Sequence, residues 1–160
     1  MPVQSLQDLV SRFDALSAAL PSLIVRNTER GALDALALTD ARLTNSGTSA
    51  SGAAFEDYTP EYKNKKTKAG RYRGHVDFQY SGQMLASTTT GFENITPTVE
   101  SIANGTAKVS FDGRDELTRK KLRGNDAKRP GFMNPSESEM EIVNKAANTN
   151  MERDIAGFFQ

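Results

Sequence analysis

Apolar residues in the first forty positions recur with the period of a helix. In 4–20 they fall every three or four residues, at Leu6, Leu9, Val10, Phe13 and Leu16, which predicts an amphipathic helix with one apolar stripe. Pro21-Ser22 predicts a break after this helix. A second, alanine-rich helix is expected from about Leu23 to Leu43, and the small polar residues 44–54 predict a loop.

Residues 55–75 contain an aromatic part followed by a basic part. Aromatic residues first flank a proline, and six Lys or Arg residues then follow within 61–75 against one acid, Glu61. Proline is favoured at the first position of a helix, so a short helical turn is expected from Pro60 to about Lys66. The rest of 44–75 is expected to be a flexible loop and an extended basic arm.

The stretch 76–111 has the pattern of strands. Val76–Tyr80 alternates apolar and polar residues, Ser81-Gly82 predicts a turn, and Gln83–Ser87 a short helix, with Met84 and Leu85 assigned to the core. Thr88–Thr90 is β-branched, and two further strands are expected at Ile95–Ile102 and Ala107–Phe111, joined by a hairpin turn at Asn104-Gly105. Together they predict a small, mostly antiparallel sheet of three to four strands.

The last fifty residues combine a basic loop with a helix. Glycine and proline in 112–135 predict a loop, with a short helix over Asp115–Arg123. Ser136 and Glu139 form a Ser-x-x-Glu capping box, which starts a helix over 136–159. The predicted fold class is α+β: a single domain, 1–160, in which N-terminal helices (1–43) and the C-terminal helix flank the sheet (76–111).

Composition suggests a chain that leaves much of its surface exposed or covered by partners. The hydrophobic fraction is 37% and the mean hydropathy is −0.55. The net charge is zero, but 61–75 carries an excess of five positive charges and 114–129 an excess of four, whereas 137–160 has an excess of three negative charges. This asymmetry suits head-to-tail contact between copies. The alternative is that these are solvated faces without a partner.

Enzyme chemistry finds little support. The chain has no cysteine, which excludes a disulfide scaffold, a zinc-thiolate site and a thiol nucleophile. The single histidine, His75, has no nearby nucleophile or second histidine, and the acids have no metal-ligand spacing. We therefore expect no enzyme activity, cofactor or metal. No segment approaches the ~20 apolar residues of a membrane span, and because the N-terminus lacks a long apolar run, no secretory signal is expected.

Nucleic-acid binding is the chemical alternative. Tyr58, Tyr62 and Tyr72 are interleaved with the lysines and arginines of 58–73, and aromatic and cationic side chains together can stack bases and hold phosphates. A basic surface loop anchored by its tyrosines would have the same composition. Zero net charge and the lack of any known nucleic-acid-binding motif argue against this as the main role.

Several motifs resemble the small neck proteins of tailed bacteriophages, the tail-completion or tail-terminator (head–tail joining) family. They are Phe55, Tyr58-Thr59-Pro60-Glu61-Tyr62, the run Lys65…Lys68-Ala69-Gly70-Arg71, Val76-Asp77-Phe78, Ser81-Gly82-Gln83-Met84-Leu85, and Arg129-Pro130-Gly131-Phe132 before Ser136. Phe78 replaces the family's usual leucine, Ser81 its threonine, and Gly131 is an insertion. The resemblance covers roughly 25–150.

The resemblance implies a structural virion protein assembled in the host cytoplasm. It implies a homo-oligomeric ring, usually sixfold, that meets a head-completion or neck protein on one side and a tail tube protein on the other. A contact between a basic block and DNA in the channel would be compatible with that place. The residues expected at such interfaces are Phe55, Tyr58, Tyr62, Lys65, Lys66 and Arg71.

Overall fold

A computed structural model describes residues 5–78, 87–88, 91–92, 95–102 and 106–160. Helices dominate this part of the chain, and the strands are short or paired only in twos. The elements are α1 (Leu6–Asn45), α2 (Pro60–Lys68), β1 (Ser87–Thr88), β2 (Gly91–Phe92), β3 (Ile95–Ile102), β4 (Thr106–Gly113), α3 (Glu116–Lys128) and α4 (Glu137–Ala156).

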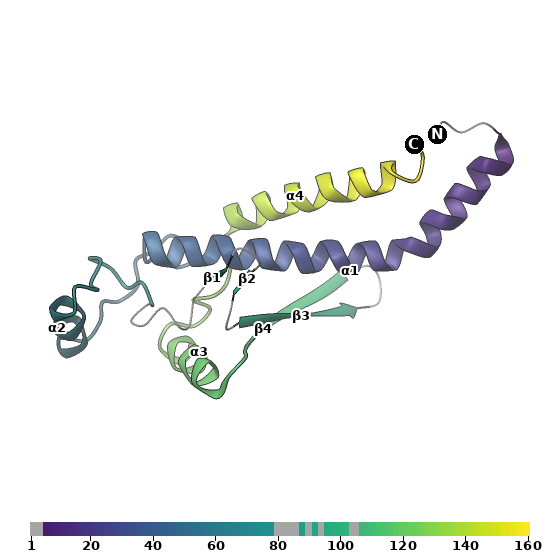
Figure 1. Cartoon of the computed structure of the whole chain (residues 1–160). Coiled ribbons are helices and arrows are strands. Elements are labelled where there is room, and N and C mark those ends of the chain that lie inside the picture. The colour runs from purple at the N-terminus through teal and green to yellow at the C-terminus, as the bar shows by residue number, and fades with distance from the viewer. Residues whose placement is uncertain (1–4, 79–86, 89–90, 93–94, 103–105) are drawn as a thin grey trace.

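The helix α1 forms the axis of the molecule. It is one helix of 40 residues, so the expected break at Pro21-Ser22 is wrong. Figure 1 shows that α1 instead bends in its N-terminal half. A proline inside a helix removes one hydrogen bond and pushes against the preceding turn, which kinks the helix without having to end it. The Ser22 hydroxyl also donates to the carbonyl of Ala19 at 2.8 Å, a bond that accompanies bending.

The helix α4 packs antiparallel along α1 (Figure 1). Its predicted capping box is confirmed: Ser136 and Glu139 each accept a hydrogen bond from the other's backbone N–H. Gly31 of α1 allows the close approach, since a Cβ there would lie 3.3 Å from Val143 Cγ1 of α4. The glycine that weakens α1 locally is therefore explained by tertiary packing.

Two ion pairs join the helices near the ends of their contact. The Arg42 guanidinium lies 2.9 Å from the Glu139 carboxylate, and both side chains are nearly buried. Further along, Arg26 lies 2.7 Å from Asp154. Arg12 continues the contact past the end of α4 by donating to the carbonyl oxygens of Phe158 and Gln160.

The predicted α+β fold, with one sheet of three to four strands, is wrong. The described strands form two separate antiparallel pairs, β1 with β2 and β3 with β4. The hairpin of β3 and β4 pairs Ile95 with Gly113 and Ile102 with Thr106, which confirms the two strands expected there. These pairs lie beside a mostly helical framework and do not form a central layer (Figure 1).

The strand expected at Val76–Tyr80 is wrong for its first three residues, because 76–78 has no strand structure. Val76 and Asp77 are both buried, at 2% and 1% exposure, so their alternation does not mark one inner and one outer face. The backbone N–H groups of Asp77 and Phe78 donate to a tyrosine hydroxyl instead of to a neighbouring strand. The expected features at Ser81-Gly82, 83–86 (including Met84 and Leu85) and Asn104-Gly105 lie outside the described residues.

The described hydrophobic core is small and lies beside the C-terminal half of α1. Leu36 and Leu43 of α1 meet Phe132 there, all nearly without exposed surface. The partly buried side chains that pack against them come mainly from non-helical segments; they are Phe55, Phe78, Leu122 and Met133. The segment expected to be a basic loop, 112–135, thus supplies a core residue and contains α3, which extends five residues beyond the Arg123 end that we expected.

Candidate interaction surface

The arm that carries the sequence motifs is fastened to its own subunit. Tyr58, Lys66 and Asp77 meet in a cluster that we call the arm lock. Lys66 of α2 forms a buried ion pair with Asp77, with side-chain exposures of 0% and 2%. The Lys66 ammonium also lies 4.8 Å from the centroid of the Tyr58 ring. A buried charge pair of this kind is sensitive to the loss of either member.

The Tyr58 hydroxyl is at the centre of the arm lock. It donates to Asp77 Oδ1 at 2.9 Å, and it accepts hydrogen bonds from the backbone N–H groups of Asp77 at 3.2 Å and Phe78 at 3.0 Å. Burial and the adjacent Asp77 carboxylate raise the pKa of Tyr58 well above its ordinary value of 10.0. The phenol is therefore neutral over the physiological range and acts as a fixed hydrogen-bonding group.

The six residues expected at interfaces divide into two sets. Phe55 packs edge-to-face on Phe78, with ring centroids 5.1 Å apart, and Lys66 is fully buried. Tyr58 belongs to the arm lock, and Tyr62 packs against its ring at 5.0 Å. The side chains with substantial exposed surface are those of Tyr62, Lys65 and Arg71. The motif thus serves first to fold the arm, and of the six expected interface residues it presents only these three outward.

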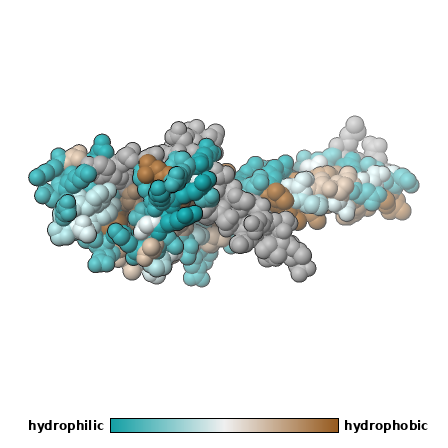
Figure 2. All heavy atoms as spheres, turned by 90° about the horizontal axis from the view of Figure 1, so that it is seen from below, coloured by the Kyte–Doolittle hydropathy of each residue, from teal (hydrophilic) through white to brown (hydrophobic). Residues whose placement is uncertain are grey.

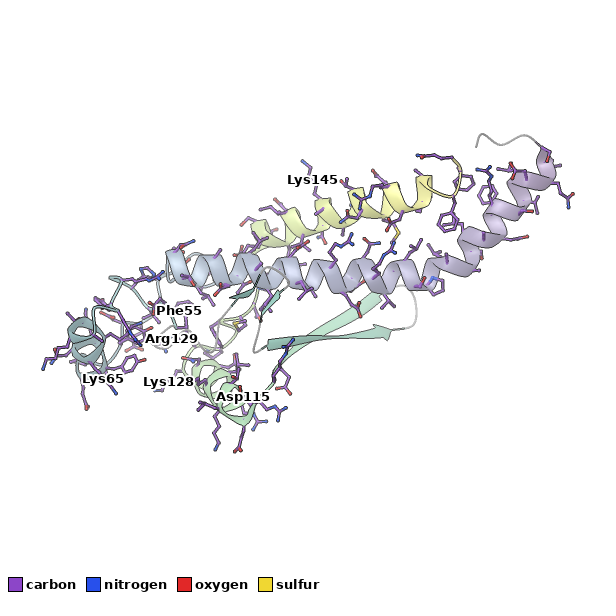
Figure 3. The ribbon with its side chains drawn as sticks, viewed as in Figure 1. Phe55, Lys65, Asp115, Lys128, Arg129 and Lys145 are labelled. Atoms are coloured by element: carbon purple, nitrogen blue, oxygen red, sulfur yellow. The ribbon has the colours of Figure 1, made fainter. Side chains whose placement is uncertain are left out.

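Two basic segments that are far apart in sequence come together at one end of the molecule. We call residues 55–78 and 112–129 the basic end. Arg129, at the end of α3, donates to the backbone carbonyl of Glu56 at 3.0 Å and lies 5.5 Å from the centroid of the Phe78 ring. Figure 3 shows Lys65, Lys128 and Arg129 on this side of the molecule, away from Lys145 on α4. The basic end holds thirteen Lys and Arg residues against eight Asp and Glu residues.

Some of these cations are neutralised locally, and others are not. Salt bridges of 2.5 to 3.3 Å join Lys63 to Asp57, Lys120 to Glu116 and Arg119 to Asp112. In contrast, the exposed side chains of Lys68, Arg123 and Lys128 have no ion-pair partner in the described part of the chain. Positive charge therefore remains available on both α2 and α3.

The acidic C-terminal segment is less available than its sequence suggests. Two of the five acids in 137–160, Glu139 and Asp154, form the ion pairs with Arg42 and Arg26 on α1. The acids left with exposed side chains are Glu137, Glu141 and Glu152, beside exposed Lys145 and Arg153. Charge complementarity between this segment and the basic end of another copy is therefore weaker than expected.

An exposed apolar stripe occupies the N-terminal half of α1. Leu6, Val10, Phe13 and Leu20 are 77%, 51%, 54% and 39% exposed. Figure 2 shows hydrophobic side chains along the narrow end of the molecule, while the broad end over α2 and α3 is mostly hydrophilic. The sequence correctly indicated an apolar stripe here. It did not indicate that Leu6, Val10 and Leu20 would stay exposed within the described chain while the Phe13 ring packs edge-to-face on Phe159 at 5.2 Å, because amphipathicity does not identify the partner.

His75 has a structural contact, since its Nε2 lies 2.9 Å from the carbonyl oxygen of Thr44 in the last turn of α1. In the residues open to description, no group of three His, Asp or Glu side chains could hold a metal ion. None of the described helices is long and apolar enough to span a membrane.

Comparison of the chain with protein-family models, with curated proteins and with solved structures yields no match.

Proposed function

We propose that this chain is a structural subunit of a homo-oligomeric ring at the head–tail junction of a tailed bacteriophage. In that position it completes or terminates the tail tube and joins it to the neck. The resemblance of the motifs in 55–87 and 129–139 to neck proteins supports a position at the head–tail junction. The exposed apolar stripe on α1 supports the association of copies into an oligomer. The stripe is the observation that carries the proposal.

The described part of a solitary subunit leaves this stripe in water, at a cost in free energy. Four large apolar side chains spaced at three to seven residues form one continuous face along α1. The segment 6–20 is about 22 Å long, at 1.5 Å of rise per residue, and the buried residues of α1 begin only after it, at Leu23. A neighbouring copy would bury the face and stabilise the segment at the same time.

The geometry of the stripe suits a closed ring. It lies at the narrow end of the molecule, whereas the broad end carries α2 and α3 (Figures 1 and 2). A patch at one end that meets a different surface of the next copy makes a heterologous contact, and repeated heterologous contacts form a ring where the rotation between copies closes and an open filament where it does not. The two faces of such a ring would then meet the head-completion or neck protein and the tail tube protein.

The test is assembly of purified protein, measured by mass in solution and by negative-stain microscopy with and without tail tubes. The wild type is expected to form rings or to cap tubes. The variant Leu6→Ser/Val10→Ser is expected to stay folded, as judged by circular dichroism, but to lose assembly. The matched control is Leu117→Ser/Ile142→Ser, which removes two apolar side chains that are 50% and 57% exposed elsewhere.

If the control assembles as the wild type does and the α1 variant does not, the contact lies on α1. A wild-type protein that remains monomeric at high concentration and ignores tail tubes would overturn the proposal. Equal loss of assembly in both double variants would overturn the role of the stripe, because it would mean that general surface hydrophobicity drives association.

A nucleic-acid-binding module that stacks bases on tyrosines is not favoured. Tyr58 is held in the arm lock, and Tyr62 packs against it. The Tyr72 ring is covered by the Lys63 ammonium at 4.9 Å, and its hydroxyl lies 3.4 Å from Asp57. Tyr58 and Tyr72 are therefore engaged within the subunit, and only Tyr62, which is 36% exposed, could stack a base without a rearrangement of the arm.

A further inference from the structure

We propose that the basic end binds the phosphate backbone of duplex DNA without reading its bases. This inference concerns a surface distinct from the α1 stripe, and it stands whether or not the chain forms a ring. It rests on how charge is distributed in the folded molecule, on the contacts that join the two basic segments, and on the contacts of their aromatic rings.

Charge is concentrated at this end far more than the neutral chain implies. The basic end has an excess of five positive charges, from thirteen basic and eight acidic residues. Because the whole chain is neutral, the remaining residues carry the matching negative excess. Such separation produces a local positive potential that attracts polyanions even when the net charge is zero.

The fold holds the two basic segments in a fixed relation. Arg129 bridges from α3 to the Glu56 carbonyl at 3.0 Å. Phe78 stacks on Phe132 with centroids 4.8 Å apart, and the arm lock ties α2 to residue 77. The cations on α2 and α3 are therefore presented together with little ordering needed on binding, which favours affinity.

The exposed cations lie on both helices. Lys68 ends α2, and Arg123 and Lys128 lie on the second half of α3. These three have no ion-pair partner in the described residues. Lysine and arginine on two short helices at the same end of the molecule can contact a polyanion, whose charges recur every 1.7 Å or so along a duplex.

The engaged tyrosines decide which nucleic acid is bound. Single-strand binding gains much of its free energy from base stacking on aromatic rings, and Tyr58, Tyr62 and Tyr72 all have intramolecular ring contacts. What remains is phosphate contact, which carries no sequence information. A duplex has the higher charge density and should bind more tightly than a single strand of the same length.

The experiment measures fluorescence anisotropy of labelled DNA with the full chain, between about 50 and about 200 mM salt. A mixed-sequence duplex, a second duplex of scrambled sequence and a matched single strand serve as probes. The wild type is expected to bind both duplexes equally and the single strand more weakly. The logarithm of its affinity should fall linearly with the logarithm of salt concentration.

The test variant is Lys68→Glu/Lys128→Glu, and the control is Arg30→Glu/Lys145→Glu on α1 and α4. Both double variants change the net charge by the same amount through exposed side chains. The test variant should lose about tenfold or more in duplex affinity, and the salt slope should decrease by about 1 per lost contact. The control should retain wild-type binding.

Three results would overturn the inference: no salt-dependent binding by the wild type, equal weakening in both double variants, or preferential binding of the single strand. Competition by poly-glutamate as effective as that by DNA would also contradict it, since the surface would then bind acidic polypeptides. Ring assembly is measured on the same samples. The test variant should still assemble, and Leu6→Ser/Val10→Ser should still bind DNA, so failure of one proposal is separable from failure of the other.

Discussion

Lys66 and Asp77 form an ion pair that is closed off from water, with side-chain exposures of 0% and 2%. The pair joins α2 to the segment 76–78, which is buried beside α1. Desolvation of two charges is costly, so such a pair is maintained by its hydrogen bonds and by the mutual attraction of its members. Here the Tyr58 hydroxyl supplies the additional hydrogen bond to Asp77.

Lys66→Ala should strongly destabilise the protein, because it leaves the Asp77 carboxylate buried without its main partner. Breaking a buried pair in this way costs about 3–5 kcal/mol. Arg73, 3.9 Å from Asp77, favours the lower end of that range. The free energy of unfolding in urea measures the effect. Lys68→Ala, at an exposed position of the same helix, should change stability by less than about 0.5 kcal/mol. Similar losses in the two variants would contradict a stabilising role for the arm lock.

Glu139 should give the protein a component of acid sensitivity. Burial by itself raises the pKa of Glu139, but hydrogen bonds from the Ser136 backbone N–H and from Arg42 outweigh burial and hold it below the ordinary value of 4.5. The contribution is therefore fully present above pH 4.5 and is lost as the pH falls through the folded-state pKa.

Glu139→Gln removes this carboxylate while keeping a side chain that is compatible with a capping box. At neutral pH the variant should be less stable than the wild type by about 1–3 kcal/mol, because the buried Arg42 guanidinium loses its charged acceptor. The difference in unfolding free energy between the wild type and this variant should narrow as the pH falls below 4.5. Urea unfolding across a pH series measures it, and Glu137→Gln, an exposed acid of the same turn, is the control. A constant difference at all pH values would refute the assignment.

Gly31 and Val143 should be energetically coupled. Alanine is favoured over glycine inside a helix by about 1 kcal/mol, but a Cβ at position 31 would lie 3.3 Å from Val143 Cγ1. Gly31→Ala alone should therefore give little or no gain in thermal stability. In a Val143→Ala background, where the crowding methyl group is absent, the same change should stabilise. A double-mutant cycle measures the coupling, and identical effects in both backgrounds would exclude close packing as the reason for the glycine.

Local patterns predicted the helices better than the sheet. The capping box at Ser136 and the proline at the start of α2 both act through neighbours within one turn, and both are confirmed. The hairpin strands also follow from nearby residues. The prediction failed at Val76–Phe78, where apolar alternation suggested a strand but a distant tyrosine takes the backbone hydrogen bonds.

The candidate surface was only partly predictable. The aromatic and basic composition of 55–75 identified the arm, but Lys66 and Lys65 are neighbours of the same type with opposite environments, one buried and one exposed. Their difference depends on where Asp77 lies, eleven positions away from Lys66. Likewise, neither basic segment by itself indicates that Arg129 brings the second one against the first.

The sequence by itself determined where α2 and α4 start, where the basic segments lie, and that α1 has an apolar stripe, because these properties depend on residues within a few positions of one another. Only the tertiary structure decided that α1 continues through Pro21, that Lys66 and Asp77 are buried together, and that the stripe at 6–20 stays exposed. Each of these depends on which distant segment packs against the residue. For the stripe, the described chain supplies too little cover, and a second copy is the partner that we propose.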